Sequence, residues 1–377
     1  MTTPTDFEIF LATVPGLERA LLSEAQEKGF REPAAIPGGV TTRGDWHEAW
    51  RANLVLRGAS HVLARLGEFR AQHLAKLDKK AHAFPWANFL RPDVPVRVEV
   101  SCKKSRIYHD KAAAERFEKA ITATCGAPIS PDADVCIKAR IVEDLCTVSV
   151  DTSGEPLHKR GHKQAVNKAP MRENLAALLL RECGYRGTEP VLDPMCGSGT
   201  FVIEAAEIAQ GLNPGRTRSF AFEKLKSFDE SAWIALKGAE TRRPCDKRFY
   251  GFDRDSGAIS MSIANADRAG VGGETVFAKQ AISDLNPPEG PTGLVIVNPP
   301  YGGRIGDTKK LAPLYKALGQ VLASRFQGWR VGIVTNSADL VKATGLSFVK
   351  RTTAFSHGGI PVKLYKTLPI KVEDYSK

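Results

Sequence analysis

P-V-L-D-P-M-C-G-S-G-T-F-V-I-E-A, residues 190–205, decides the fold class. Val191 and Leu192 predict a short buried strand, and Asp193 places an acid at its end. Gly197 and Gly199 allow a sharp turn and let a ligand approach the main chain, because neither residue carries a Cβ atom. The apolar run that follows predicts a helix packed on a sheet. The stretch is therefore typical of the first strand–helix turn of a doubly wound, Rossmann-like α/β fold.

This glycine turn differs from the dinucleotide-binding fingerprint. That fingerprint requires a third glycine, and this chain has Val202 near that position. An acid at the strand end followed by G-S-G instead suits a ligand with an amino-acid head and a nucleoside tail. The ligand's carboxylate could meet the start of the helix and its ammonium could meet an acid.

A second informative stretch, L-V-I-V-N-P-P-Y-G, follows about a hundred residues later at 294–302. Its four apolar residues predict a buried parallel strand. The two prolines cannot donate to a strand ladder, so the chain must leave the sheet there. Ligands of open α/β sheets bind outside the carboxyl ends of the strands, and both stretches should therefore face one crevice.

Together these stretches resemble the class I S-adenosylmethionine-dependent methyltransferases, in the branch that methylates exocyclic amino nitrogens. An aromatic amino group is a poor nucleophile because its lone pair is delocalised into the ring. The resemblance implies that the side-chain carbonyl of Asn298 and the main-chain carbonyl of Pro299 accept its two N–H groups. Pro299 and Pro300 would stiffen this arrangement. Tyr301 would stack on a flipped base, with neither a metal nor a covalent nucleophile required.

The resemblance also implies which residues surround the cofactor, S-adenosyl-L-methionine. Asp253 would hold the ribose hydroxyls after the next strand, although a helix-capping aspartate is the rival interpretation. Relatives place an acid directly after the following strand, where this chain has Ala281, and Asp284 is the substitute. Glu173 is equally explained as a charge favoured at a helix start. The expected set is Pro170, Glu173, Asp193, Met195, Cys196, Gly197, Gly199, Thr200, Asp253, Asp284 and Asn298.

Composition excludes several classes of protein. The 377 residues are 42% hydrophobic without a run of transmembrane length, and the first residues lack the features of a signal peptide. The seven cysteines form no C-x-x-C pair, which predicts neither a metal site nor a disulfide framework. We therefore expect a cytoplasmic protein. The net charge of +11 favours a polyanionic partner, and lysine and arginine outnumber acids within residues 43–119.

The N-terminal half resembles a ferredoxin-like domain, expected over 1–60, followed by a THUMP RNA-binding domain over 61–155. The segments T-V-P-G-L-E (13–18), N-L-V-L-R (53–57) and S-C-K-K-S-R-I-Y-H (101–109) carry this resemblance. Within this half we expect a strand over 7–11, helices over 17–28, 46–66 and 111–125, and strands over 94–100, 135–142 and 146–150. Candidate RNA-binding residues are Lys103, Lys104 and Arg106.

The methyltransferase domain is expected over 156–377 and ends in an antiparallel hairpin over 348–355 and 360–368. Arg304 either contacts RNA or is a plain surface arginine. Residues 213–233 form an insertion that either flanks the RNA or covers the sheet, and His357 is interpreted as structural.

The joining segment from Leu157 is similar to that of bacterial THUMP-containing guanine-N2 methyltransferases of large-subunit ribosomal RNA. We therefore expect methyl transfer to guanine N2 in RNA, most simply 23S ribosomal RNA. The alternatives are transfer RNA as substrate, an adenine-N6 DNA methylase, and a non-catalytic RNA-binding assembly factor. The sequence leaves the oligomeric state open.

Overall fold

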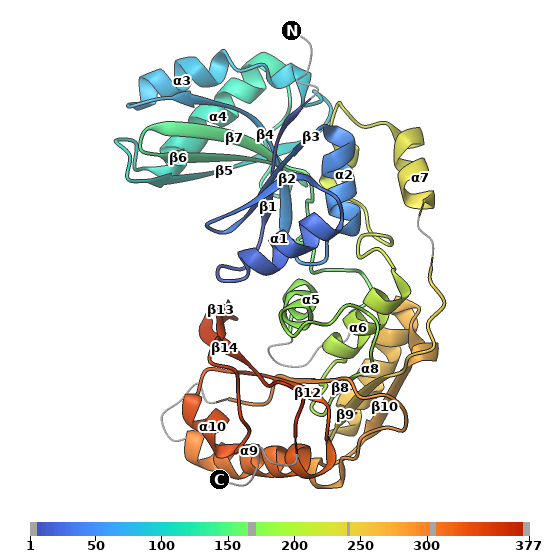
Figure 1. Cartoon of the computed structure of the whole chain (residues 1–377). Coiled ribbons are helices and arrows are strands. Elements are labelled where there is room, and N and C mark those ends of the chain that lie inside the picture. Colours follow the sequence, from blue (N-terminus) through green and yellow to red (C-terminus); the bar gives the residue numbers. More distant parts are fainter. Residues whose placement is uncertain (1–5, 165–170, 240–241, 302–306, 372–377) are drawn as a thin grey trace. The chain divides into compact units, whose positions relative to one another are not determined.

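The computed structural model describes residues 6–164, 171–239, 242–301 and 307–371, and the chain divides into two compact units (Figure 1). The first comprises Met1–Thr13, Leu21–Leu157 and Gly215–Glu240. The second comprises Val14–Ala20, His158–Pro214 and Thr241–Lys377. Each unit is built on one seven-stranded sheet.

The first unit's sheet has the strand order β2-β3-β1-β4-β7-β6-β5, and only β5 and β6 are parallel to each other. The strands of residues 1–60 and 61–155 share this one sheet, because β1 pairs with β4. The strands are β1 Phe7–Ala12, β2 Arg31–Ile36, β3 Gly39–Gly44, β4 His61–Arg70, β5 Val96–Lys103, β6 Val135–Val142 and β7 Leu145–Asp151. The helices are α1 Glu18–Glu27, α2 Trp46–Val55, α3 Leu74–His82 and α4 Asp110–Cys125.

The helix predicted over 46–66 was wrong in its second half. Helix α2 ends at Val55, and the chain re-enters the sheet as β4 from His61. Val62 and Ala64 are buried while their neighbours are partly exposed, which is the period-two pattern of a strand. Strand β4 lies between β1 and β7, so strand pairing on both sides replaces helical hydrogen bonds.

The insertion expected at 213–233 belongs to the first unit from Gly215 onward. From Gly215 the chain returns to that unit, where the Phe222 ring stacks on Trp50 of α2 with centroids 5.6 Å apart. Trp233, on α7 (Glu230–Gly238), meets the Phe222 ring edge-on. This excursion therefore adds aromatic side chains to the core beside α2.

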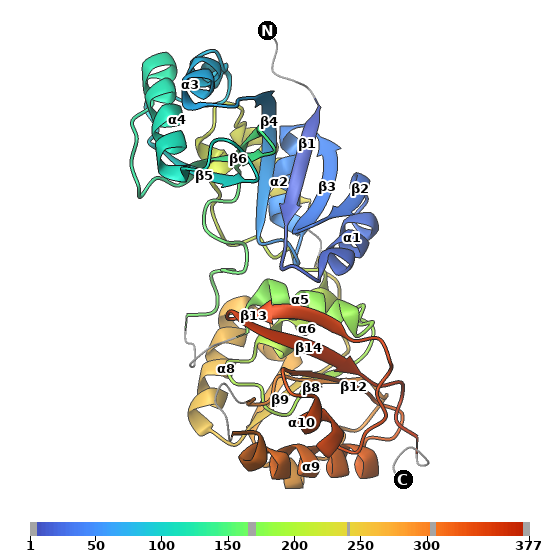
Figure 2. The ribbon, with the colours of Figure 1, turned by 90° about the vertical axis from the view of Figure 1, so that its left-hand side faces the viewer.

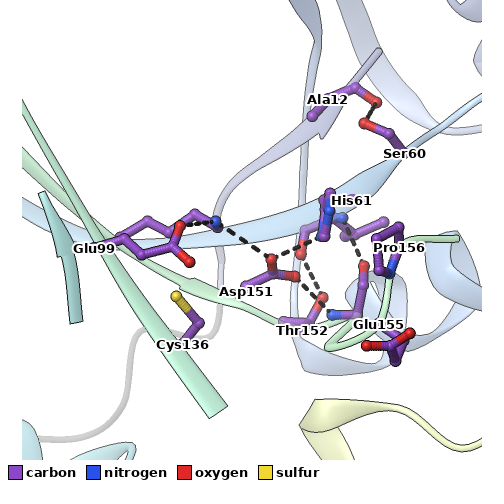
Figure 3. Close-up of polar contacts among 12 residues, drawn as sticks. Ala12, Ser60, His61, Glu99, Cys136, Asp151, Thr152, Glu155 and Pro156 are labelled. Atoms are coloured by element: carbon purple, nitrogen blue, oxygen red, sulfur yellow. Dashed lines mark hydrogen bonds and ion pairs between the residues drawn. The ribbon is translucent and has the colours of Figure 1, made fainter. Parts of the chain in front are cut away.

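A polar network links side chains on neighbouring strands of the first unit's sheet (Figure 3). The Asp151 carboxylate is fully buried, with Oδ2 2.8 Å from His61 Nδ1 on β4 and 3.8 Å from Lys138 Nζ on β6. Lys138 also donates to Glu99 on β5 at 2.5 Å. Burial disfavours the ammonium, but the bond to Glu99 and the surrounding charges raise the pKa of Lys138. Four adjacent strands are thereby tied together through their side chains.

The second unit's sheet has the order β10-β9-β8-β11-β12-β14-β13, and only β14 runs antiparallel to the other strands. Helices α5, α6 and α8 lie on one face, and α9 and α10 lie on the other (Figures 1 and 2). This arrangement confirms the predicted doubly wound fold with a closing antiparallel hairpin. The strands are β8 Val191–Asp193, β9 Phe249–Asp253, β10 Thr275–Lys279, β11 Leu294–Val297, β12 Arg330–Thr335, β13 Thr353–His357 and β14 Ile360–Lys366. The helices are α5 Glu173–Glu182, α6 Thr200–Gln210, α8 Ser256–Ala269, α9 Asp307–Arg325 and α10 Ala338–Ala343.

The strand order reverses between β8 and β11. From β8 the chain moves outward through β9 to β10, and it then returns to β11 on the other side of β8. Such a reversal opens a crevice at the carboxyl ends of the two central strands. Those ends carry Asp193 and Asn298, the residues at the centre of the two diagnostic stretches.

Candidate functional site

The glycine turn after β8 is shaped for a ligand. Gly199 precedes α6 with φ 82°, and a Cβ atom there would lie 3.1 Å from the side chains of Phe277 and Ser262. Gly197 has φ 56°, and a Cβ atom there would meet nothing within 4 Å. Gly199 is therefore required for conformation and packing, whereas Gly197 faces open space that a bound molecule can occupy.

Two carboxylates lie at the strand ends beside this turn. Asp193 is buried, and its Oδ1 accepts from the Met195 amide at 3.0 Å. Burial, reinforced by the charge of Asp253, raises the pKa of Asp193 to about 8 against the pull of the Met195 amide. The Asp253 carboxylate accepts from the Gly197 amide at 3.1 Å and from the Asp255 amide at 3.0 Å. The cap of α8 is Asp255, so Asp253 is not that helix's cap.

The remaining turn residues pack tightly. Cys196 is buried, with its sulfur 3.8 Å from the Ser262 hydroxyl, and burial raises the pKa of its thiol, which agrees with a packing role. Thr200 is buried at the first position of α6 and donates to the Met171 carbonyl at 3.4 Å. This contact ties the start of α6 to the residues that precede α5.

A pocket, here called the strand-end pocket, lies beyond β8, β9, β10 and β11. Its lining includes Pro194, Met195, Asp253, Ala281, Asn298 and Leu311. Asp284 is exposed, accepts from the Ser283 hydroxyl at 3.1 Å, and is absent from this lining.

Asn298 follows β11 and presents an unmatched acceptor. Its side-chain oxygen is buried and has no hydrogen-bond partner among the residues that the structure describes. A buried carbonyl without a donor is costly, and in a native structure such an atom calls for an explanation. Asn298 is the residue for which sequence reasoning predicted an acceptor awaiting an amino group.

A second pocket, here called the hairpin-side pocket, also has Asn298 in its lining. Its lining includes Met171, Glu173, Asn298, Pro299, Tyr301 and His357, together with residues of the segment 158–163. Asn298 and Pro300 line both pockets. The N-P-P-Y segment therefore contributes to both pockets, with Pro299 and Tyr301 lining the hairpin-side pocket alone.

The segment 158–163 forms a basic wall of the hairpin-side pocket. Lys163 donates to the Met171 carbonyl at 2.5 Å and lies 3.5 Å from the Glu173 carboxylate. Burial lowers the pKa of Lys163 and raises that of Glu173. Burial, together with nearby arginines and lysines, lowers the pKa of His158 to about 4. His158 is therefore neutral at pH 7 in a region of positive potential.

The candidate RNA-binding residues of the first unit lie around the end of β5. Lys103, Lys104 and Arg106 are all exposed, and the Arg106 side chain reaches an Asp144 oxygen at 3.8 Å. Tyr108 is 72% exposed beside them, with its ring centroid 4.1 Å from that of His109. The structure places these cations together at one edge of the sheet.

Two predicted site residues, Pro170 and Arg304, lie outside the described residues. Within the ranges described, no three potential metal-ligating side chains of His, Cys, Asp or Glu come together. None of the helices in the described part of the chain is long and apolar enough to cross a bilayer.

Sequence reasoning missed two features of this site and one residue of the first unit. His357 was interpreted as structural, but it lines the hairpin-side pocket and hydrogen-bonds to Tyr301. The basic wall was noticed only as a joining segment, although its cluster of His, Lys and Arg was a visible signal. Tyr108 was also not proposed as a site residue, although the sequence shows it as an aromatic residue just after a run of cations.

Comparison with known proteins agrees with this geometry. Residues 160–365 match the family described as "RMKL-like, methyltransferase domain", and residues 8–63 match the "RlmL ferredoxin-like domain".

Two curated relatives bear the name ribosomal RNA large subunit methyltransferase K/L. The protein of Psychromonas ingrahamii is 34% identical over 89% of this chain and 47% of its own length. The protein of Marinobacter nauticus is 33% identical over 94% of this chain and 52% of its own. The chain thus spans about half the length of the curated relatives it matches.

Solved structures resemble nearly the whole chain. SMU.472 in complex with SAH has a TM-score of 0.86 at 27% identity and covers 98% of this chain and 100% of its own. A protein of Listeria monocytogenes, described as a predicted N6-adenine-specific DNA methylase, has a TM-score of 0.87 at 28% identity. It covers 97% of this chain and 96% of its own.

Proposed function

The chain belongs to the RMKL-like methyltransferase-domain family, and on that premise we propose that it methylates guanine N2 in RNA of the large ribosomal subunit. S-adenosyl-L-methionine is the cofactor. It supplies an electrophilic methyl group attached to a sulfonium sulfur. The names of the curated relatives support large-subunit ribosomal RNA as the substrate over transfer RNA.

The strand-end pocket and its glycine turn fit this cofactor. Asp193, in its ionised form, provides the partner for the amino-acid ammonium, and Asp253 provides acceptors for the ribose hydroxyls. Open space over Gly197 leaves room for the ligand beside the main chain. Met195, Cys196, Gly199 and Thr200 shape the turn, and Pro170 and Glu173 are assigned to the methionine end. Ala281 lines the pocket where the adenine is expected, and Asp284 would have to leave Ser283 to reach the ring.

The unmatched oxygen of Asn298 is the observation that carries the proposal. An exocyclic amino group has two N–H donors, and Asn298 Oδ1 with the Pro299 carbonyl offers two acceptors. Accepting hydrogen bonds from both N–H groups draws the nitrogen lone pair out of the ring and directs it at the methyl group. Pro300 restricts the backbone, and Tyr301 provides a face for the base.

We propose that the first unit binds the RNA. We assign residues 1–60 to a ferredoxin-like domain, 61–155 to a THUMP-type domain and 156–377 to the methyltransferase domain. The exposed cations Lys103, Lys104 and Arg106 would neutralise backbone phosphates. Arg304 is assigned to the RNA on the catalytic side.

One alternative substrate has specific support. The Listeria monocytogenes structure is described as a predicted N6-adenine-specific DNA methylase, and N-P-P-Y chemistry suits amino groups on several bases. An adenine amino group has the same two N–H donors and would meet the same acceptors. The experiment must therefore identify the methylated base and the kind of nucleic acid that carries it.

The test uses RNA and DNA from a strain that lacks the gene. Both are incubated with the purified protein and labelled cofactor, digested to nucleosides and analysed by mass spectrometry. We expect N2-methylguanosine from the large-subunit RNA alone. N6-methyladenine in DNA would replace the proposal with the alternative, and label in neither would favour the non-catalytic assembly factor.

A further inference from the structure

We propose that His357 is a positioning residue that holds the Tyr301 ring in place as the stacking wall for the target base. This inference rests on the proposed function, because it assigns a task to a residue of the same site. A hydrogen bond of 2.8 Å joins the Tyr301 hydroxyl and Nδ1 of His357. Both side chains line the hairpin-side pocket.

The bond spans two distant parts of the chain. Tyr301 follows β11 in the parallel part of the sheet, whereas His357 ends β13 in the closing hairpin, 56 residues further on. His357 is 8% exposed, and the antiparallel register pairs it with Ile360, which also lines the pocket. The backbone of His357 is thus fixed in the hairpin, and its imidazole is largely buried.

The other side of the N-P-P-Y segment is anchored from the core. The hydroxyl of Tyr315, on α9, lies 3.3 Å from the Pro300 carbonyl and 3.2 Å from the Thr335 hydroxyl. Tyr315 is fully buried, so this anchor fixes the backbone just before Tyr301. The backbone at Pro300 is therefore fixed by a residue of α9, and the Tyr301 ring is positioned by a residue of the hairpin.

Burial favours a stable bond between the two side chains. Burial raises the pKa of Tyr301, so its hydroxyl remains protonated near neutral pH and retains its hydrogen-bonding proton. A tyrosine ring that is already oriented loses little conformational freedom when a base stacks on it. Without His357 the RNA would have to order the ring, which weakens productive binding more than it slows the chemical step.

The expected loss follows from the strength of one hydrogen bond. A single intramolecular hydrogen bond contributes about 0.5–1.5 kcal/mol, which corresponds to roughly 2- to 12-fold in an equilibrium constant. We expect this increase in the KM for RNA in His357→Leu and in Tyr301→Phe, with kcat little changed. The double variant should be no worse than either single one, because both remove the same bond.

The control variants separate positioning from general damage to the hairpin. His357→Asn offers an amide near the position of Nδ1 and should restore the KM, whereas His357→Gln places its amide near Nε2 and should not. Ser356→Ala, at the exposed neighbouring position of β13, should behave as wild type. Affinity for S-adenosylhomocysteine, measured by calorimetry, should be the same in all variants.

The measurement is steady-state methylation of unmodified large-subunit RNA, with thermal unfolding recorded for each variant. Equal and non-additive KM increases, reversed by His357→Asn, support the proposal. Additive effects of the two single changes, or His357→Asn matching His357→Leu, overturn it while leaving the proposed function intact. Absence of RNA methylation by the wild type overturns both.

Discussion

The raised pKa of Asp193 makes cofactor binding dependent on pH, and Asp193→Asn should abolish that dependence. Burial keeps the carboxyl protonated in the cofactor-free protein below about pH 8. The ammonium of the cofactor requires the carboxylate, so binding below that pH must release one proton. Rising pH strengthens cofactor binding, but it lowers the free energy of unfolding of the cofactor-free protein. An acid with a raised pKa makes folding less favourable as pH rises from the unfolded pKa towards 8.

The size of the effect follows from proton linkage. One released proton changes the dissociation constant tenfold per pH unit, or about 1.4 kcal/mol. S-adenosylhomocysteine should therefore bind about tenfold more tightly at pH 7 than at pH 6. The gain should level off near pH 8, where the α-amino group of the ligand begins to lose its own proton. Asp193→Asn should bind weakly at every pH, show no such slope, and unfold at a higher temperature than wild type at pH 8.

Calorimetry of S-adenosylhomocysteine binding between pH 6 and 7.5 measures this directly. Repeating each titration in buffers of different ionisation enthalpy counts the released protons, with one expected for wild type and none for Asp193→Asn. Asp246→Asn is the matched control, because it changes a carboxylate that is 84% exposed in the same unit. A flat wild-type profile, or a slope that survives in Asp193→Asn, would refute the role assigned to this carboxylate.

Three further predictions concern the first unit. Charge reversal at Lys103, Lys104 and Arg106 should weaken RNA binding and flatten its dependence on salt by roughly one unit of slope per lost phosphate contact; a slope and affinity equal to wild type would make these residues plain surface. Tyr108→Ala should weaken binding to single-stranded RNA by about 1–3 kcal/mol with the salt slope unchanged, as expected for lost base stacking, and Tyr108→Phe should bind as wild type. Asp151→Ala should lower the free energy of unfolding by about 1–3 kcal/mol, because His61 and Lys138 lose their buried carboxylate partner. Urea denaturation followed by circular dichroism checks this last value, and a loss below 1 kcal/mol would contradict it.

Features whose position depends only on neighbouring residues could be predicted from the sequence. The glycine turn, Asp193 and Asn298 lie at the ends of short apolar strands, and each prediction needed only a strand and its terminus. The closing hairpin was likewise predicted from two apolar runs around Ser356 to Gly359, although β13 begins later than expected, at Thr353. These features follow from residue type and spacing alone.

Features that depend on tertiary pairing were harder to predict. Residues 56–66 contain enough leucine and valine to suggest a continued helix, but pairing with β1 and β7 makes His61–Arg70 a strand. His357 acquires its role only when the hairpin folds beside β12 and brings it to Tyr301. The return of residues 215–240 to the first unit depends on Trp50 and Phe222 meeting across the fold.

The central claim is that the unmatched Asn298 oxygen orients the amino group for methyl transfer. The most direct test is single-turnover methylation at saturating RNA and cofactor, comparing wild type with Asn298→Ala. We predict a rate about 10²–10³-fold lower, as is typical when a preorganised polar contact is lost, with unchanged affinity for S-adenosylhomocysteine. A wild-type rate in Asn298→Ala would contradict the account, because the amino group would then be oriented by another group.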